Sequence, residues 1–371
     1  MRVLLPTHQL AAAGIGTVIE GLARSLPRAL GPEDELLLVG ECPAGLDGFN
    51  VRCIGSPGVA RTRIGRLLYE QVGTGRAART VDLVHLANPH ALLLSSTPFV
   101  LTIHDVFFLD RPEWYPHSFV AFKRAMLAMV MTGGPRLIVC VSDYSRRALL
   151  AQYPEREADV RVVHPGLAAG ERVEPAGGTE PYFLTLATFE PRKNHLGLLQ
   201  AFRRARERGL RLRWKVAGIE GYGSRQILGA LREQPGVDVL GRVSNAERER
   251  LYRGALFFAF PSHAEGFGFP PLEAMVRGVP TICSQGSSMD ETVADAAIRV
   301  RSDDVEGWAD ALLRLADDEH ERERLRAAGL ARAAEFTWER TASRYVACYR
   351  EALGLVAPPE RAVAAADSRG P

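Results

Sequence analysis

The chain has 371 residues, too long for one ordinary hydrophobic core, so we expect two domains of roughly 150 to 200 residues each. Hydrophobic residues make up 46% and charged residues 24% of the sequence, a composition that excludes a disordered chain. The net charge is only +2 and no basic stripe is interleaved with aromatic residues, so we expect no nucleic-acid partner.

Short apolar runs alternate with stretches of helical periodicity in the first half of the chain. Continuous apolar runs of this kind are typical of strands buried in a parallel sheet. Residues 17–26 (TVIEGLARSL) show the helical periodicity between two of these runs. The predicted strands are residues 2–6, 36–39, 81–86, 99–104 and 137–142.

Residues 160–183 lose this periodicity and gain proline and glycine, which predicts a linker. The alternation then restarts and ends in a long helical tail. The second set of predicted strands is residues 182–187, 212–218, 237–241, 256–260 and 280–284. Two consecutive βαβ arrays predict an α/β protein with two doubly wound domains, whose ligands lie at the carboxyl ends of the strands in the cleft between them.

We place the N-terminal domain at residues 1–170 and the C-terminal domain at residues 171–337. The last stretch, residues 357–371, is of low complexity, and we expect it to be a disordered tail.

The sequence also bears on the cellular compartment. The five cysteines are odd in number and include no C-x-x-C pair, which predicts reduced thiols in a cytoplasmic protein. Proline at position 6 interrupts the first apolar run, so we expect a strand there and no signal peptide. No stretch approaches the length of a membrane span. Residues 119–131 combine an apolar patch with Lys123 and Arg124, and here a helix packed on a sheet is favoured over peripheral membrane contact.

Gly14 and Gly16 lie between the first predicted strand and the helix that follows it. A glycine turn at a helix N-terminus can receive a phosphate or a sugar hydroxyl. The full dinucleotide fingerprint is absent, and a plain tight turn is an equal alternative.

His104 and Asp105 end the apolar run of residues 99–104. Polar residues at the carboxyl end of a strand are where α/β folds place their chemistry, although a histidine there can also be structural. We favour the functional interpretation.

Arg192 and Lys193 are adjacent cations in a loop between a predicted strand and a helix that Asn194 can cap. Lysine occurs at only three positions, 123, 193 and 215, so arginine supplies 43 of the 46 basic residues. A rare lysine beside an arginine favours binding of a diphosphate, which accepts one bidentate guanidinium and one compact charge.

Residues 264–280 (AEGFGFPPLEAMVRGVP) place two glutamates eight positions apart. Pro271 suits the first turn of a helix that Gly278 can end. Gly266 and Gly268 then lie in the loop before this helix, where a bare backbone can approach an anion. Glu265 enters the loop and Glu273 lies in the helix. The alternative is a surface loop with an acid that complements the helix dipole.

No metal-binding motif is recognisable. The sequence contains no H-x-x-H or H-E-x-x-H helix and no pair of aspartates one residue apart after an apolar strand. A G-x-S-x-G nucleophile turn is also missing. We therefore expect neither a metal nor another cofactor.

Eight segments of this chain occur in the same order as similar segments of the retaining glycosyltransferases of family 4, and the chain resembles that family. Its members have the GT-B architecture of two Rossmann-like domains facing across a cleft. Residues 264–280 look like the E-x7-E motif of that family. The other similar segments are residues 14–16, 102–105, 141–149, 189–194, 241–244, 251–262 and 336–342. The sequence is most similar to the mannosyltransferase-like branch, in which GDP-mannose is the leading donor and dTDP- or UDP-sugars are alternatives.

The resemblance implies a role for each candidate residue. Arg192 and Lys193 would neutralise the leaving diphosphate, helped by backbone N–H groups near Gly14 and Gly16. Glu273 would bind the ribose hydroxyls. The remaining roles follow the same motifs: Glu265 with Gly266, Phe267 and Gly268 would orient the sugar, His104 would lie near the reacting centre, and Gly241, Arg242 and Val243 would border the base. A helix at about residues 338–356 would cross back to the N-terminal domain.

This sequence also departs from the family pattern in three places. Thr17 follows Gly16 where that branch often has an arginine or asparagine, and we expect this to change details of donor or acceptor binding. His164 replaces the usual asparagine or leucine, and we expect it to lie away from the donor. Asp290 stands where proline is common, and we expect it to alter the rim that faces the sugar.

Two alternative functions remain open. One is a GT-B nucleotide-sugar 2-epimerase, for which the E-x7-E motif would not be expected. The other is a non-catalytic family member that acts as a scaffold, against which the intact set of acids and cations speaks. The acceptor, whether a small molecule, a lipid-linked group or a glycan, is not identified, and the arginine bias suggests a GC-rich bacterial genome.

Overall fold

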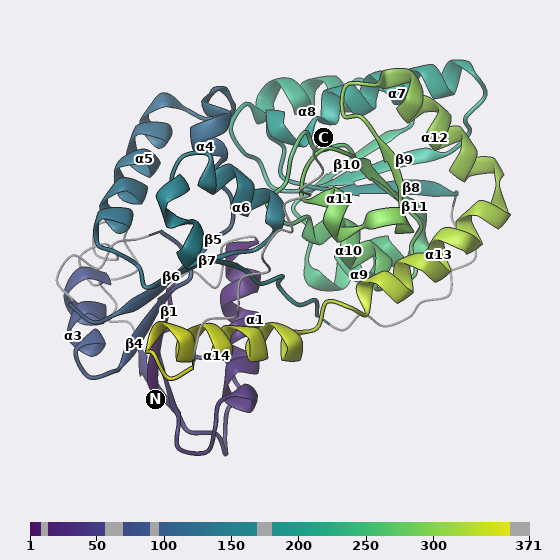
Figure 1. The fold of residues 1–371 in the computed structure, drawn as a ribbon. Helices are drawn as coiled ribbons and strands as arrows, with labels where there is room; N and C mark the ends of the chain where they lie inside the picture. Colours follow the sequence, from purple (N-terminus) through teal and green to yellow (C-terminus); the bar gives the residue numbers. More distant parts are fainter. Residues whose placement is uncertain (9–13, 56–69, 90–95, 169–179, 357–371) are drawn as a thin grey trace, which may run out of the picture.

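The structure is a computed structural model that describes residues 1–8, 14–55, 70–89, 96–168 and 180–356 (Figure 1). The predicted tail at 357–371 and the middle of the predicted linker lie outside these residues. Two α/β domains stand side by side in Figure 1, and each is built on its own parallel sheet.

The N-terminal domain contains a seven-stranded parallel sheet of order β3-β2-β1-β4-β5-β6-β7. Its strands are β1 (Arg2–Thr7), β2 (Glu35–Gly40), β3 (Val51–Gly55), β4 (Leu83–Leu86), β5 (Phe99–Ile103), β6 (Leu137–Cys140) and β7 (Val160–Val162). Side chains alternate across a strand, so β1 contributes to a core on both faces. Val3 and Leu5 lie in the core with helices α1 and α14, whereas Leu4 lies in the core with α3, α5 and α6. The helices are α1 (Ile15–Ala29), α3 (Gly75–Ala78), α4 (Phe107–Asp110), α5 (His117–Thr132), α6 (Asp143–Leu150) and α14 (Trp338–Ala352).

The C-terminal domain repeats this construction with a six-stranded parallel sheet of order β10-β9-β8-β11-β12-β13. Its strands are β8 (Tyr182–Leu186), β9 (Arg213–Ala217), β10 (Val237–Gly241), β11 (Ala255–Phe260), β12 (Thr281–Ser284) and β13 (Ile298–Val300). Its helices are α7 (His195–Glu207), α8 (Ser224–Arg232), α9 (Asn245–Gly254), α10 (Phe269–Met275), α11 (Met289–Thr292), α12 (Val305–Asp317) and α13 (Glu319–Ala333). Phe183 and Phe257 pack beneath α7, α8 and α12, and Leu184 and Phe258 pack beneath α9, α10 and α11. The predicted fold class is therefore confirmed.

Three strands escape the sequence prediction: β3, β7 and β13. Each lies at an edge of its sheet, where one side has no neighbouring strand to bury it. Edge strands are short and carry polar residues, as the exposed Arg52 of β3 does. β7 falls within residues 160–183, so the linker begins later than predicted.

Cys42 and Cys53 form a disulfide, which corrects the expectation that all thiols are reduced. β2 and β3 are parallel neighbours, and this pairing brings the loop after β2 close to Cys53 in β3. Their spacing of eleven residues matches no common cysteine motif, so the sequence carries no signal for the bond. Cys140, Cys283 and Cys348 are free and buried.

None of the helices in the described part of the chain combines the length and the apolar character of a membrane span. α5, which contains all of residues 119–131, packs Leu127 and Val130 against the sheet core, as the favoured interpretation predicted. Its exposed large apolar side chains are Phe119, Phe122 and Met129. Peripheral membrane contact through them stays a prediction.

The closing helix α14 runs back beside α1 of the N-terminal domain (Figure 1). A buried polar network fixes it there. Nδ1 of His85 in β4 lies 2.7 Å from the Tyr349 hydroxyl, and Nε2 lies 2.8 Å from Thr102 Oγ1. The Tyr345 hydroxyl lies 3.0 Å from the same Thr102 oxygen. Burial lowers the pKa of His85 to about 3, so this ring is neutral at physiological pH.

We predict that Tyr349→Phe lowers the free energy of unfolding by about 1–3 kcal/mol, because it leaves a buried ring nitrogen of His85 without its partner. Urea unfolding measures the loss. Tyr222→Phe is the matched control, since Tyr222 is 54% exposed. Equal stability of the two variants would contradict the role of the network.

Candidate functional site

A cavity of about 690 Å³ lies between the domains at the carboxyl ends of their central strands. Eleven of the thirteen candidate residues line it: Gly14, His104, Arg192, Lys193, Arg242, Val243, Glu265, Gly266, Phe267, Gly268 and Glu273. The fold therefore brings together residues that are up to 259 positions apart, from Gly14 to Glu273.

The cation loop follows β8 as a short helical turn, Pro191–Lys193. Asn194 then adopts a left-handed conformation with φ of 52° and occupies the N-cap position of α7. The helical turn therefore ends at Lys193, and both cations lie just before the first residue of α7. Arg192 Nη1 lies 3.0 Å from Glu265 Oε2, and Lys193 Nζ lies 2.6 Å from Glu265 Oε1. One carboxylate thus holds both cations.

The three charges of this cluster are nearly shielded from water. The side chains of Arg192, Lys193 and Glu265 are 15%, 11% and 10% exposed. Burial alone raises the pKa of the Glu265 carboxyl, but the neighbouring Arg192 and Lys193 outweigh it and bring the pKa to about 2. Glu265 is therefore ionised throughout the physiological range.

Three residues that the sequence analysis did not single out complete this cluster. Ser262 Oγ donates to Glu265 Oε1 over 2.5 Å, and Glu190 Oε1 accepts from Arg192 Nη2 over 2.8 Å. The Phe107 ring of the N-terminal domain lies beneath the Arg192 guanidinium, 5.5 Å from it. Glu190 and Ser262 fall within segments that resemble the family, and that was their only signal.

His104 enters the cavity from the end of β5 in the N-terminal domain. Its Nε2 lies 2.8 Å from the backbone oxygen of Ala87, an oxygen that can only accept, so Nε2 carries the proton. Burial lowers the pKa of His104, which keeps the ring neutral. Nδ1 is then left as the acceptor of this ring.

Gly266 is the point at which the two domains touch beside the site. A Cβ atom on this residue would stand 2.1 Å from the backbone oxygen of His104, so no larger residue fits without moving the domains. The Gly266 carbonyl in turn accepts a hydrogen bond from Ser142 Oγ over 2.5 Å, across the domain boundary.

Glu273 lies in the first turns of α10, and the loop before this helix ends at Gly268 with φ of 94°. Glycine adopts that conformation without the strain that a Cβ atom would cause. Glu273 Oε2 accepts a hydrogen bond of 3.2 Å from the hydroxyl of Tyr252, which is fully buried. Tyr252 thus orients a carboxylate that faces the cavity.

Two of the candidate residues lie elsewhere. Gly16 is buried inside the first turn of α1, so the cavity wall is formed by Gly14, Ile15 and Thr17 instead. Gly241 lies in an adjoining hollow on the other side of Arg242. Glycine spacing indicates where a backbone can bend, but it does not say which atoms face the ligand.

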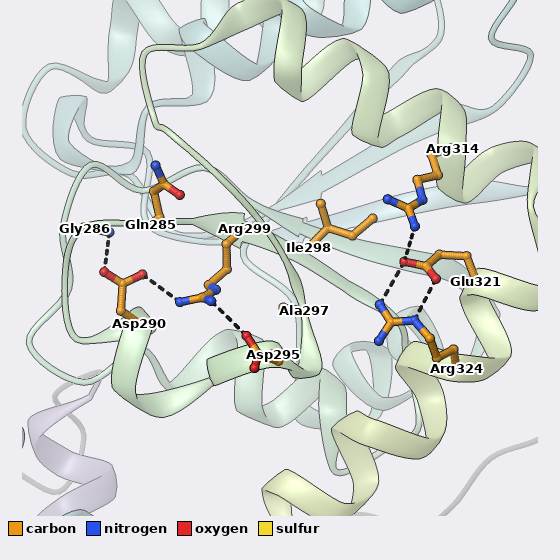
Figure 2. A pocket seen from close by; sticks show the side chains of 10 residues that line it. All are labelled: Gln285, Gly286, Asp290, Asp295, Ala297, Ile298, Arg299, Arg314, Glu321 and Arg324. Atoms are coloured by element: carbon orange, nitrogen blue, oxygen red, sulfur yellow. Dashed lines mark hydrogen bonds and ion pairs between the residues drawn. The ribbon is translucent and has the colours of Figure 1, made fainter.

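A second hollow lies on the C-terminal domain, away from the first (Figure 2). Its charged residues are three arginines and three acids: Arg299, Arg314, Arg324, Asp290, Asp295 and Glu321. Each guanidinium is paired with one of the acids, so the hollow offers no net charge to an anion. Asp290 lies here and not on the wall of the interdomain cavity, which corrects the expectation that it alters the sugar-facing rim. Among the described residues, no group of three or more His, Cys, Asp or Glu side chains could hold a metal ion.

Comparisons with known proteins identify the family of this chain. The family model "Glycosyltransferase Family 4" matches residues 12–169, and the model "Glycosyl transferases group 1" matches residues 171–332. The O-antigen chain mannosyltransferase B of Escherichia coli is 33% identical over 271 residues, which cover 68% of this chain and 70% of the relative. The chain belongs to glycosyltransferase family 4.

A further relative and two solved structures are also similar to this glycosyltransferase. The D-inositol 3-phosphate glycosyltransferase of Thermobifida fusca is 30% identical over 66% of this chain and 60% of its own. Among solved structures, Anabaena HepE in complex with UDP and glucose has a TM-score of 0.71 at 16% identity, with 96% of this chain and 100% of that one covered. A sucrose-phosphate synthase from Thermosynechococcus elongatus has a TM-score of 0.73 at 18% identity, with 96% of this chain and 100% of that one covered. These two structures share the GT-B fold with the glycosyltransferase.

We predict that Glu265→Gln destabilises the glycosyltransferase by about 3 kcal/mol near neutral pH, because it leaves two buried cations without their shared carboxylate. The folded pKa of about 2 lies below the ordinary 4.5, so the stabilisation is complete above 4.5 and is lost as the pH falls towards 2. Urea unfolding of the wild type and of Glu265→Gln measures the difference in their free energies of unfolding. This difference should be constant between about pH 6 and pH 8 and should shrink below about pH 4.5.

The matched control for this comparison is Glu20→Gln, which breaks an exposed pair with Arg24 and should cost under about 1 kcal/mol. If Glu265→Gln lowers the free energy of unfolding as little as the control does, or by an amount independent of pH, Glu265 does not stabilise the two buried cations.

Proposed function

We propose that this enzyme is a retaining, metal-independent glycosyltransferase that moves a sugar from a nucleotide-sugar donor to a hydroxyl of an acceptor. The observation that carries the proposal is the pair of buried cations, Arg192 and Lys193, which face an interdomain cavity opposite the neutral His104. Such a pair is suited to a diphosphate, and the cavity is large enough for a nucleotide sugar.

The choice of donor rests on the relatives. The names of two of them, from Escherichia coli and Salmonella typhimurium, specify O-antigen chain mannosyltransferases, which favours GDP-mannose as the leading donor. The Anabaena structures were solved with UDP and UDP-glucose, which keeps UDP-sugars as alternatives. The three buried free cysteines support a cytoplasmic location, whereas the Cys42–Cys53 disulfide does not.

The proposed reaction breaks the bond between the anomeric carbon of the sugar and the diphosphate oxygen. The acceptor hydroxyl attacks that carbon from the face that the diphosphate leaves, and its proton passes to the departing phosphate oxygen. Negative charge grows on the diphosphate in the transition state, and Arg192 and Lys193 are held in place to stabilise it before the reaction begins.

The other cavity residues bind and orient the donor in this proposal. Nδ1 of His104 accepts a hydrogen bond from a sugar hydroxyl, because its Nε2–H is engaged with Ala87. Glu273, oriented by Tyr252, accepts from the ribose hydroxyls. Arg242 and Val243 border the base.

We predict that Arg192→Ala and Lys193→Ala each lower kcat/KM by about a hundredfold or more, equivalent to about 3 kcal/mol of transition-state stabilisation. Activity should survive EDTA. Initial rates with and without chelator test both expectations, and Arg225→Ala on the exposed face of α8 is the matched control.

Thermal unfolding must accompany these assays, because both alanine variants leave the buried Glu265 short of a partner. Near wild-type rates in both variants, or activity lost in EDTA and restored by Mg²⁺, would contradict the mechanism. Incubation with the donor alone separates the alternatives: conversion of the sugar at C2 would indicate an epimerase, and no turnover with any donor and acceptor would indicate a scaffold.

We further predict that Glu273→Ala raises the donor KM by about tenfold or more and changes kcat little, because ribose contacts are the same in the ground state and the transition state. Steady-state kinetics measures both constants. A collapse of kcat at an unchanged KM would instead place Glu273 in the chemical step.

A further inference from the structure

One contact between the domains is made by a side chain outside the cavity. Glu291 belongs to α11 of the C-terminal domain, and its carboxylate reaches the first turn of α6 in the N-terminal domain. Oε2 accepts from the backbone N–H of Asp143 over 2.9 Å, and Oε1 accepts from that of Tyr144 over 3.0 Å. The first N–H groups of a helix have no partner within it and carry partial positive charge, so a carboxylate is the favoured group there.

The same turn of α6 also holds the loop of the site. Ser142, the residue that caps α6, donates to the Gly266 carbonyl. Ser145 Oγ lies 2.9 Å from the His104 carbonyl and 3.2 Å from that of Gly266. Ser288, three residues before Glu291, donates to the Glu265 carbonyl over 2.8 Å. The two peptide groups that flank Gly266 are therefore fixed from different domains, the Glu265–Gly266 peptide by Ser288 at α11 and the Gly266–Phe267 peptide by Ser142 and Ser145 of α6.

Other groups hold Glu291 where it is. Its backbone oxygen accepts from Arg332 of α13, which also donates to the Thr292 carbonyl. His164, in the segment that joins the domains, has its Nε2 3.6 Å from Glu291 Oε2. Burial raises the pKa of Glu291, but His164 and the two N–H groups outweigh it and lower the pKa below its usual value. The carboxylate therefore bears its charge at neutral pH.

We propose that Glu291 is a positioning residue that latches the two domains in the register in which His104 faces Arg192, Lys193 and Glu265. The proposal rests on the proposed glycosyl transfer, to which it adds a requirement. Donor-binding groups such as Glu273 and the cations belong to the C-terminal domain, whereas His104 belongs to the N-terminal domain and lines the cavity in the relative position of the domains that the structure shows. Loss of the latch should therefore impair turnover and leave nucleotide binding intact.

The test uses the full chain with two fluorophores, one at Arg124→Cys on α5 and one at Arg225→Cys on α8, both exposed positions on different domains. In Glu291→Gln, an amide replaces one carboxylate oxygen and the charge is lost. We expect single-molecule energy transfer to show a more open population, kcat to fall about ten- to hundredfold, and the Kd of nucleoside diphosphate to stay within about threefold. Glu323→Gln, which breaks an exposed pair with Arg326, is the matched control.

A second pair of variants at Asp143 tests the other side of this contact, the backbone N–H group that donates its hydrogen bond to Glu291. Asp143 is the first residue of α6 and follows Ser142, whose backbone is extended, so proline is tolerated there. Asp143→Pro lacks one of the two N–H groups that bind Glu291 and should shift the domains towards the open population, whereas Asp143→Ala keeps both and should not.

The possible outcomes of this experiment can be told apart. An energy-transfer distribution and kcat like wild type in both Glu291→Gln and Asp143→Pro would overturn the latch. So would an equal loss of nucleotide binding and turnover, which would place Glu291 in the donor site. If wild type transfers no sugar at all, the proposed function fails, but the energy-transfer comparison still decides whether Glu291 closes the domains.

Discussion

The ion pairs between Glu265 and the cations Arg192 and Lys193 are the constraint on which the rest of the site depends. A buried charge without a partner costs several kcal/mol, so these three side chains can occupy the interior only together. Their pairing ties the loop after β8 to the loop after β11. Those loops in turn place Gly266 against the backbone of His104, and the neighbouring domain becomes part of the same wall.

This cluster also sets the electrostatics that a donor would meet. Glu190 and Glu265 balance Arg192 and Lys193, so the buried group is close to neutral before a ligand binds. The acids hold the cations in fixed positions, and little side-chain ordering is left for the moment of reaction. The acids also reduce the net positive charge of the cluster. Stabilisation of a departing diphosphate therefore depends more on the orientation of the two cations than on their number.

The sequence predicted the inner strands from local patterns, and local patterns together with the family resemblance supplied eleven of the residues that line the cavity. Continuous apolar runs identify buried strands, and glycine, proline and acid spacing identifies the loop of Glu265. Local patterns did not reveal three of the four edge strands, β3, β7 and β13, whose residues are partly polar, or the bond between Cys42 and Cys53. Glycine spacing also did not show that Gly16 is buried in α1 and does not line the cavity, because glycine marks backbone freedom and not the direction of a ligand.

The contacts between the domains were out of reach for a related reason. Ser142 and Ser145 bind the carbonyl groups of Gly266 and His104, and Glu291 binds two backbone N–H groups of α6. Every residue has a backbone carbonyl, and every residue except proline an N–H, so the partner in such a contact leaves no trace in the sequence. Only the serines and the glutamate are visible, and each is unremarkable alone. A few polar side chains that bind backbone groups therefore help to fix the relative position of the domains, and these contacts can be recognised only in the folded structure.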